Sequence, residues 1–284
     1  MLAAACRCAV ALLALARAAD AEPTKPPLPP GRDPGGIAIA LFSTGIDYTL
    51  PDVAARLARD GEGELIGWDA VDGDNRPLAA RAAAPANWGG DGTLLARALG
   101  ATGRRLIPVR VSPADPGSLA VAVAFLAATP ARIVAVPMWS AAEPEWQPFR
   151  RAASRASGLL FIVAAGEEGR DLDRDPVWPA GYGLSNALVV ARAPAAGVPG
   201  ALANDGRRVE ALLPAADAEA QPVTAQGAAL TAVRAADAVA GCWPELIAAY
   251  RGSALKAALL AAAANQAPTA DKPLLACSAR NRQP

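Results

Sequence analysis

The pattern of apolar residues constrains the fold of this chain more than any other feature of its sequence. Short apolar runs rich in β-branched residues alternate with longer alanine-rich stretches, as strands alternate with helices in α/β proteins. We expect strands at residues 37–42, 64–68, 106–111, 133–137, 159–164, 187–191 and 209–213. We expect helices at residues 92–99, 118–128, 146–156, 230–240 and 253–263. Several of these strands are apolar throughout, as a parallel sheet covered on both faces requires, so the sequence predicts a doubly wound α/β domain.

The composition excludes several classes of function. With 53% hydrophobic and 19% charged residues among 284, the chain can bury a sizeable core and is not a disordered protein. Its 27 basic and 27 acidic side chains balance, so it lacks the charge of a protein that binds nucleic acid or an anionic membrane. The sequence contains no histidine, which excludes an imidazole base and any metal site built on histidine. We expect no cofactor.

The first 21 residues have the features of an export signal. Arg7 is the only charged residue before Arg17, residues 9–16 form an apolar run, and the motif A-D-A at residues 19–21 has the small side chains of a cleavage site. A short buried or frayed helix is the alternative interpretation. No segment has about 18 uninterrupted apolar residues, so we expect no membrane span and an exported protein, periplasmic or secreted.

The composition also suggests the domain organisation. Residues 22–36 are proline-rich and aperiodic, which predicts an extended linker. The alternating pattern then fills residues 37–265 as one domain, and residues 266–284 form a C-terminal tail. Removal of the signal leaves Cys242 and Cys277 as the only cysteines, and in an oxidising compartment they are a candidate disulfide.

Six short motifs follow one another along the domain. They are I-A-L-F-S-T-G-I-D-Y-T-L-P-D at 39–52, G-W-D-A-V-D-G-D-N at 67–75, G-D-G-T at 90–93, I-V-A-A-G-E-E-G at 162–169, W-P-A-G-Y at 178–182 and G-A-A-L-T-A-V at 227–233. In sequence and in order they resemble the motifs of the subtilisin-like serine proteases, from about residue 36 to residue 265. The resemblance implies the subtilisin-like fold, a mainly parallel sheet between two helical layers.

The residues that perform catalysis in that family are all replaced here. By the resemblance, Ser43 stands in place of the aspartate, Asp91 of the histidine, Ala229 of the serine nucleophile and Glu167 of the oxyanion-hole asparagine. A methyl group cannot attack a carbonyl, and a carboxylate aimed at an oxyanion would repel it. A rival placement of the nucleophile at Ser253 leaves only about 30 residues for the helices that follow it and still lacks a base. We therefore expect no catalytic residues.

Two groups of aspartates are weak candidates for a calcium site. Asp171, Asp173 and Asp175 alternate as in an EF-hand loop, but proline and tyrosine stand where that loop needs glycine and glutamate. A looser oxygen cage there, or one at Asp72 and Asp74, is weighed against solvated turns. We expect no metal ion at either place.

The sequence favours one function over two alternatives. It predicts an exported pseudoprotease that binds a peptide or another exported protein through the remnant of the family's cleft. The alternatives are a hydrolase with altered chemistry, which would pair Ser43 with Asp91, and a structural scaffold whose cleft is filled. Trp139 and Trp146 flank a loop after an expected strand, where they are either ligand contacts or packing residues.

Overall fold

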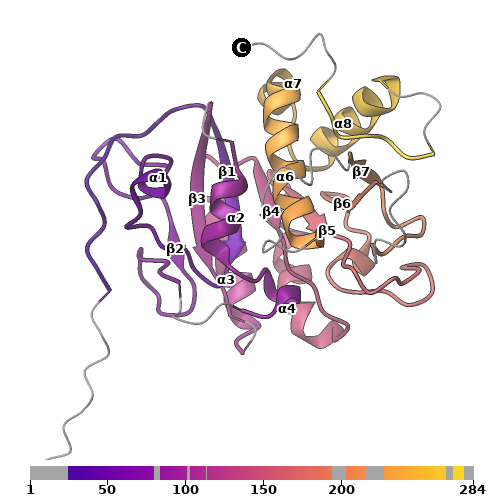
Figure 1. Ribbon diagram of the computed structural model, residues 1–284, viewed down its shortest axis with the longest axis horizontal. Helices are drawn as coiled ribbons and strands as arrows, with labels where there is room; N and C mark the ends of the chain where they lie inside the picture. The colour runs from indigo at the N-terminus through magenta and orange to yellow at the C-terminus, as the bar shows by residue number, and fades with distance from the viewer. Residues whose placement is uncertain are drawn as a thin grey trace, which may run out of the picture.

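Figure 1 shows the computed structural model of the chain, which describes residues 25–79, 84–100, 103–112, 114–193, 203–214, 227–266 and 271–277. The expected export signal, residues 1–21, lies outside the described residues, as do residues 278–284 of the expected tail. None of the described helices is both long enough and apolar enough to cross a membrane.

Seven parallel strands form one sheet, in the order β2-β3-β1-β4-β5-β6-β7. They are β1 (Ile37–Ser43), β2 (Trp68–Asp69), β3 (Arg104–Arg110), β4 (Ile133–Val136), β5 (Leu160–Ala164), β6 (Ala187–Arg192) and β7 (Ala211–Leu213). From β1, strands β3 and β2 extend the sheet to one side and strands β4 to β7 extend it to the other, as in doubly wound sheets. The predicted α/β class with a parallel sheet is confirmed.

The helices connect and flank these strands (Figure 1). They are α1 (Pro51–Ala54), α2 (Gly92–Ala98), α3 (Gly117–Ala127), α4 (Glu143–Ala153), α6 (Gly227–Cys242), α7 (Pro244–Ala249) and α8 (Gly252–Gln266), with 3-10 turns η1 (Ala86–Trp88) and η2 (Ala180–Tyr182). The sequence pattern did not predict α1 and α7, because one or two turns are too short to display an apolar period.

The expected strand at 64–68 is wrong over most of its length, since only Trp68 joins the sheet. The Asp60 carboxylate accepts hydrogen bonds from the N–H groups of Glu62 and Glu64 and folds the chain back on itself. Leu65 then pairs antiparallel with Arg59, so its backbone is used in this local turn and not in the sheet.

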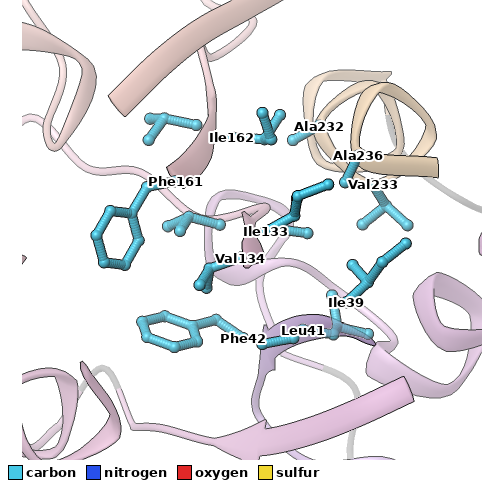
Figure 2. Packing of buried hydrophobic residues seen from close by; sticks show 14 of the residues in the cluster. Ile39, Leu41, Phe42, Ile133, Val134, Phe161, Ile162, Ala232, Val233 and Ala236 are labelled. Atoms are coloured by element: carbon cyan, nitrogen blue, oxygen red, sulfur yellow. The ribbon is translucent and has the colours of Figure 1, made fainter. Parts of the chain in front are cut away.

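Alternate side chains of the central strands pack against different helices (Figure 2). On one face, Ile39, Ile133 and Ile162 lie toward Ala232, Val233 and Ala236 of α6. On the other face, the rings of Phe42 and Phe161 pack edge-on against Phe149 of α4, with ring centres 6.4 and 5.2 Å apart. Helices therefore cover both faces, and this is why the strands are apolar throughout.

Both segments that flank the domain in sequence contact it. Residues 25–36 contain no helix or strand, but they lie against the domain through side-chain contacts. At the other end, Leu274 pairs with Leu212 of β7, and Leu275 beside it is fully buried. Cys277 is joined to Cys242, the last residue of α6, with their Cα atoms 5.0 Å apart. The disulfide therefore ties the end of the described chain to α6, next to the segment that pairs with β7.

Candidate functional site

Four residues that the sequence singled out lie at the carboxyl ends of the parallel strands or at the helices that begin there. Ser43 ends β1, and Glu167 follows β5, so both lie at the carboxyl ends of parallel strands. Asp91 precedes α2, and Ala229 lies in the first turn of α6. In doubly wound folds this edge is where ligands bind and where the helices that follow the strands begin. The fold thus brings four separate motifs into one region.

Ser43 is a buried turn residue. Its side chain is 1% exposed, and its Oγ accepts a hydrogen bond from the N–H of Gly45 at 3.2 Å. It also touches the start of α2, since a Cβ built on Gly92 would lie 2.8 Å from the Ser43 Cβ. Ser43 therefore lies against the residue that follows Asp91, and this contact leaves no room for a side chain at position 92.

Asp91 caps helix α2. Its Oδ1 accepts hydrogen bonds from the N–H groups of Thr93 at 2.8 Å and Leu94 at 3.2 Å, as N-cap aspartates do. In the part of the chain that the structure describes, Asp91 and Ser43 hydrogen-bond to nearby backbone and not to each other. The Asp91 carboxylate thus has structural partners at the start of α2.

Glu167 places its carboxylate on the start of α6. Its Oε2 accepts a hydrogen bond from the N–H of Ala228 at 2.9 Å. The approach requires glycine at the preceding position, because a Cβ built on Gly227 would lie 2.3 Å from the same oxygen. A negative charge is favoured there by the orientation of the helix dipole. The Glu167 side chain therefore accepts a hydrogen bond from α6, whereas the asparagine that the resemblance implies at this position would donate one.

A network of hydrogen bonds holds the loop that carries Glu167. The Glu168 carboxylate accepts hydrogen bonds from the Trp139 indole N–H, from the N–H of Glu167 at 3.1 Å and from Asn204 Nδ2 at 2.8 Å. Asn204, 1% exposed, also accepts from the N–H groups of Glu168 and Arg170. Sequence analysis did not identify Glu168 or Asn204. Asn204 had no signal, since it is 36 residues from the loop that it fixes.

The side chain at position 229 is small and buried. Ala229 is 1% exposed and presents only a methyl group. The site region does contain one serine paired with a carboxylate, since Ser140 Oγ donates to Glu145 Oε2 at 2.6 Å. However, the same Oγ accepts from Trp146 Nε1 and from the N–H of Ala142, so both of its lone pairs are used. Ser140 is therefore a structural residue at the start of α4 and not a nucleophile.

Trp139, in the loop after β4, and Trp146, in α4, are both core residues. Trp146 is fully buried and stacks on Trp88 with ring centres 5.6 Å apart. Trp139 is 1% exposed and packs over Gly166, whose Cβ position would lie 3.1 Å from Trp139 Cδ1. The packing interpretation therefore holds for both, and Trp139 fills space directly beside the Glu167 loop.

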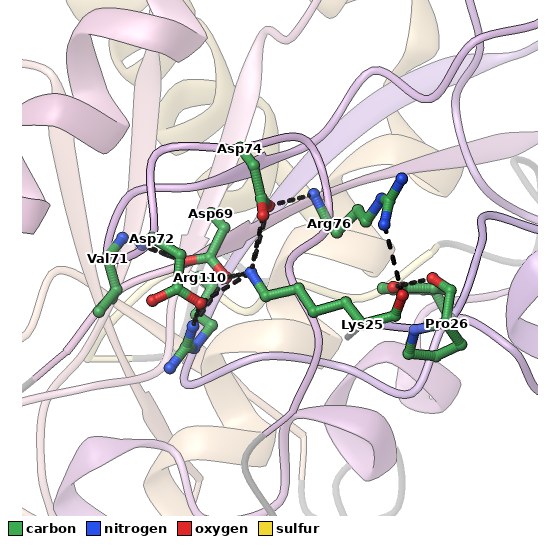
Figure 3. A network of polar contacts seen from close by, with 9 residues as sticks. Lys25, Pro26, Asp69, Val71, Asp72, Asp74, Arg76 and Arg110 are labelled. Atoms are coloured by element: carbon green, nitrogen blue, oxygen red, sulfur yellow. Dashed lines mark hydrogen bonds and ion pairs between the residues drawn. The ribbon is translucent and has the colours of Figure 1, made fainter. Parts of the chain in front are cut away.

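The aspartates considered for calcium bind cations of the chain itself. Asp72 and Asp74 contact Lys25, at 2.8 and 3.1 Å (Figure 3). The other three, Asp171, Asp173 and Asp175, pair with separate arginines, which are Arg174, Arg207 and Arg170 respectively. Within the described ranges, no group of three or more His, Cys, Asp or Glu side chains is arranged to hold a metal ion.

Comparisons with known proteins agree with the geometry of the fold. No protein-family model and no curated protein matches the sequence. Among solved structures, a cold-adapted subtilisin-like serine proteinase matches at TM-score 0.59 and 16% identity, over 87% of this chain and 90% of that one. The A-subunit of the AB5 toxin from E. coli matches at TM-score 0.61 and 14% identity, over 81% of this chain and 84% of that one. The nisin leader peptidase NisP from Lactococcus lactis matches at TM-score 0.58 and 14% identity, over 86% of this chain and 87% of that one. At these identities the comparisons show a shared fold.

Proposed function

We propose that this chain, which has the subtilisin-like fold, is an exported pseudoprotease: it cuts no peptide bond and binds a peptide or protein partner at the site described above. The observation that carries the proposal is the 2.9 Å hydrogen bond from the Ala228 N–H to the Glu167 carboxylate. It supports the loss of catalysis directly, because it places a negative charge where the family's mechanism needs a hydrogen-bond donor.

The physical argument concerns the charge that develops during acyl transfer. Attack on a peptide carbonyl produces an oxyanion, which must be stabilised by donors aimed at it. Here the start of α6 already donates to a carboxylate, and a second negative charge beside Glu167 would be repelled. Ala229 in the same turn has no nucleophilic atom, and Asp91 is used as a helix cap. These features disfavour the alternative of a hydrolase with altered chemistry.

A scaffold function is a second candidate, favoured by the way the site region is filled. Trp139 is buried beside Glu167, and its backbone N–H donates to the carbonyl of Asn87 at 2.7 Å. Ser140 exchanges two backbone hydrogen bonds with Trp178, at 3.0 and 2.8 Å. These backbone groups are thus not free to pair with a peptide. A partner would contact the exposed rim, for which Ala141 is a suitable probe position.

Site-directed photo-crosslinking in cells tests partner binding. A photoreactive residue at Ala141, on the rim, is expected to capture one defined peptide or protein several-fold more strongly than the same residue at Ala127. Ala127 is a matched control, because it is also an exposed alanine but ends α3 near the opposite edge of the sheet. Equal capture from both positions, or capture from neither, would contradict partner binding and support the scaffold.

Export is tested on the purified native protein. We expect mass spectrometry to find a chain that begins at Glu22, because the residues before it have the features of a cleaved signal. Recovery of chains that retain Met1 would show that the signal interpretation is wrong, independently of the outcome of the crosslinking.

A further inference from the structure

Residues 25–36, called the strap from here on, are attached to the domain in an unusual way. Among the described residues, no backbone group of the strap hydrogen-bonds to another backbone group. The first such bond is made by Ile37, where β1 begins. The strap therefore depends on contacts that involve side chains. Its ion pairs are made by Lys25 and Asp33, toward its two ends.

The first end is the ammonium group of Lys25, which lies among three carboxylates (Figure 3). Its Nζ is 2.6 Å from Asp69, 2.8 Å from Asp72 and 3.1 Å from Asp74. Arg110 reaches the same pocket and contacts Asp69 and Asp72, each at 2.7 Å. Two cations thus face three carboxylates, and the Asp69 side chain is completely buried.

The protonation equilibria agree with a strong attachment at this end. Burial alone would lower the pKa of Lys25, but hydrogen bonds to Asp69, Asp72 and Asp74 raise it above its ordinary value. The hydrogen bond from Lys25 is the largest cause that lowers the pKa of Asp72. Each partner therefore stabilises the charged form of the other.

The rest of the strap is held by donors of the domain. The Tyr48 hydroxyl donates to the Pro26 carbonyl at 2.8 Å, and Arg59 Nη2 donates to the Pro29 carbonyl at 2.6 Å. At the second end, Asp33 Oδ2 accepts from the N–H of Arg59 at 2.7 Å and from Arg105 at 3.0 Å. These partners belong to β3 and to the chain between β1 and β2, so the strap lies along one side of the molecule.

We propose that the strap is a releasable latch: when Lys25 leaves its pocket, residues 25–36 lift off as a unit while the sheet stays folded. The sheet can stay folded because opening breaks none of its backbone pairing, and the strap residue that packs against the hydrophobic core, Leu28, is only partly buried. Opening would uncover Tyr48 and Asp69 and leave the three carboxylates with Arg110 as their cation. The inference does not depend on the proposed function.

A thiol introduced by Leu28→Cys in the full chain reports the opening, because the partly buried side chain at this position packs against the core and becomes fully exposed when the strap lifts. The rate at this site is measured by peptide mass spectrometry in three backgrounds: otherwise wild type, Lys25→Met and Lys256→Met. Lys256→Met is the matched control, because Lys256 is also a largely buried lysine, paired at 2.6 Å with Glu210 before β7, away from the strap.

We expect Lys25→Met to accelerate alkylation about tenfold to a hundredfold, the range expected when hydrogen bonds between charged groups are lost. Lys256→Met should leave the rate unchanged. Asp74→Asn, a milder change at a half-exposed carboxylate, should accelerate it less and covers the case in which Lys25→Met does not fold. An unchanged rate in Lys25→Met, equal acceleration by Lys256→Met, or alkylation that occurs only on global unfolding would overturn the latch.

Discussion

The wild-type chain is expected to cleave unfolded casein at no measurable rate, and none of the single reversions Ser43→Asp, Asp91→His, Glu167→Asn or Ala229→Ser is expected to restore cleavage. Catalytic groups of this kind act as a unit, and removal of the triad from subtilisin lowers kcat by about a million-fold. A hydroxyl introduced by Ala229→Ser would have no imidazole to take its proton. It would also lie one residue from the N–H that donates to Glu167.

The structure adds a separate cost to two of the four substitutions. Asp91→His removes the carboxylate that caps α2, and Ser43→Asp puts a larger side chain against Gly92. We therefore expect even the fourfold variant to be a weak enzyme. The other three substitutions should have no effect on cleavage unless Glu167→Asn accompanies them, because only this change removes the negative charge from the start of α6.

Cleavage of fluorescent casein measures turnover, and labelling by a fluorophosphonate probe measures whether a reactive serine is present. The wild-type chain should neither release fluorescence nor bind the probe, and the fourfold variant should bind the probe if the nucleophile is correctly placed. Turnover by the wild-type chain that disappears in Ser43→Ala would overturn the pseudoprotease proposal and promote the hydrolase with altered chemistry.

Loss of the Cys242 to Cys277 link should lower the free energy of unfolding by about 3 to 4 kcal/mol, the chain-entropy value for a loop of this length. The two cysteines are 35 residues apart in sequence. The double variant Cys242→Ala and Cys277→Ser avoids a hydroxyl at Cys242, which is 2% exposed. Chemical denaturation compares this variant with the oxidised and the reduced wild-type chain.

The location of the effect is a second readout of the same prediction. Leu212 donates to the Pro273 carbonyl at 2.9 Å, and Leu275 donates back to Leu212 at 2.8 Å. Hydrogen exchange should increase at Leu212 and Leu275 in the double variant, while β4 and β5 stay protected. The reduced wild-type chain should behave like the variant. Equal unfolding free energies with and without the link would contradict the prediction.

The repeated pattern along the chain was sufficient to predict the class of fold. Strands such as β4 and β5 are buried on both faces, so each is an uninterrupted apolar run that can be recognised without knowledge of its neighbours. Where a strand forms only over two residues, as β2 does, the pattern failed, because a local turn at Asp60 competes for the backbone.

The sequence alone also determined which chemical groups are missing from the site. The absence of histidine and the alanine at position 229 are facts of composition and motif, and no folding can supply an imidazole or a hydroxyl there. The resemblance further implied that Ser43 and Asp91 lie side by side, and the structure places Ser43 against Gly92, which follows Asp91.

Only the tertiary structure decided what the replacing side chains do. Three hydrogen bonds of this kind join distant parts of the sequence. They link Glu167 to Ala228, Asn204 to Glu168 and Lys25 to Asp69, at sequence separations of 61, 36 and 44 residues. An apolar period records which face of an element is buried, and this is a local property of the chain. The partner of a polar side chain depends on which distant segments the packed core brings together. The same carboxylate could therefore be a solvated charge, a metal ligand or a helix cap until the packing around it was known.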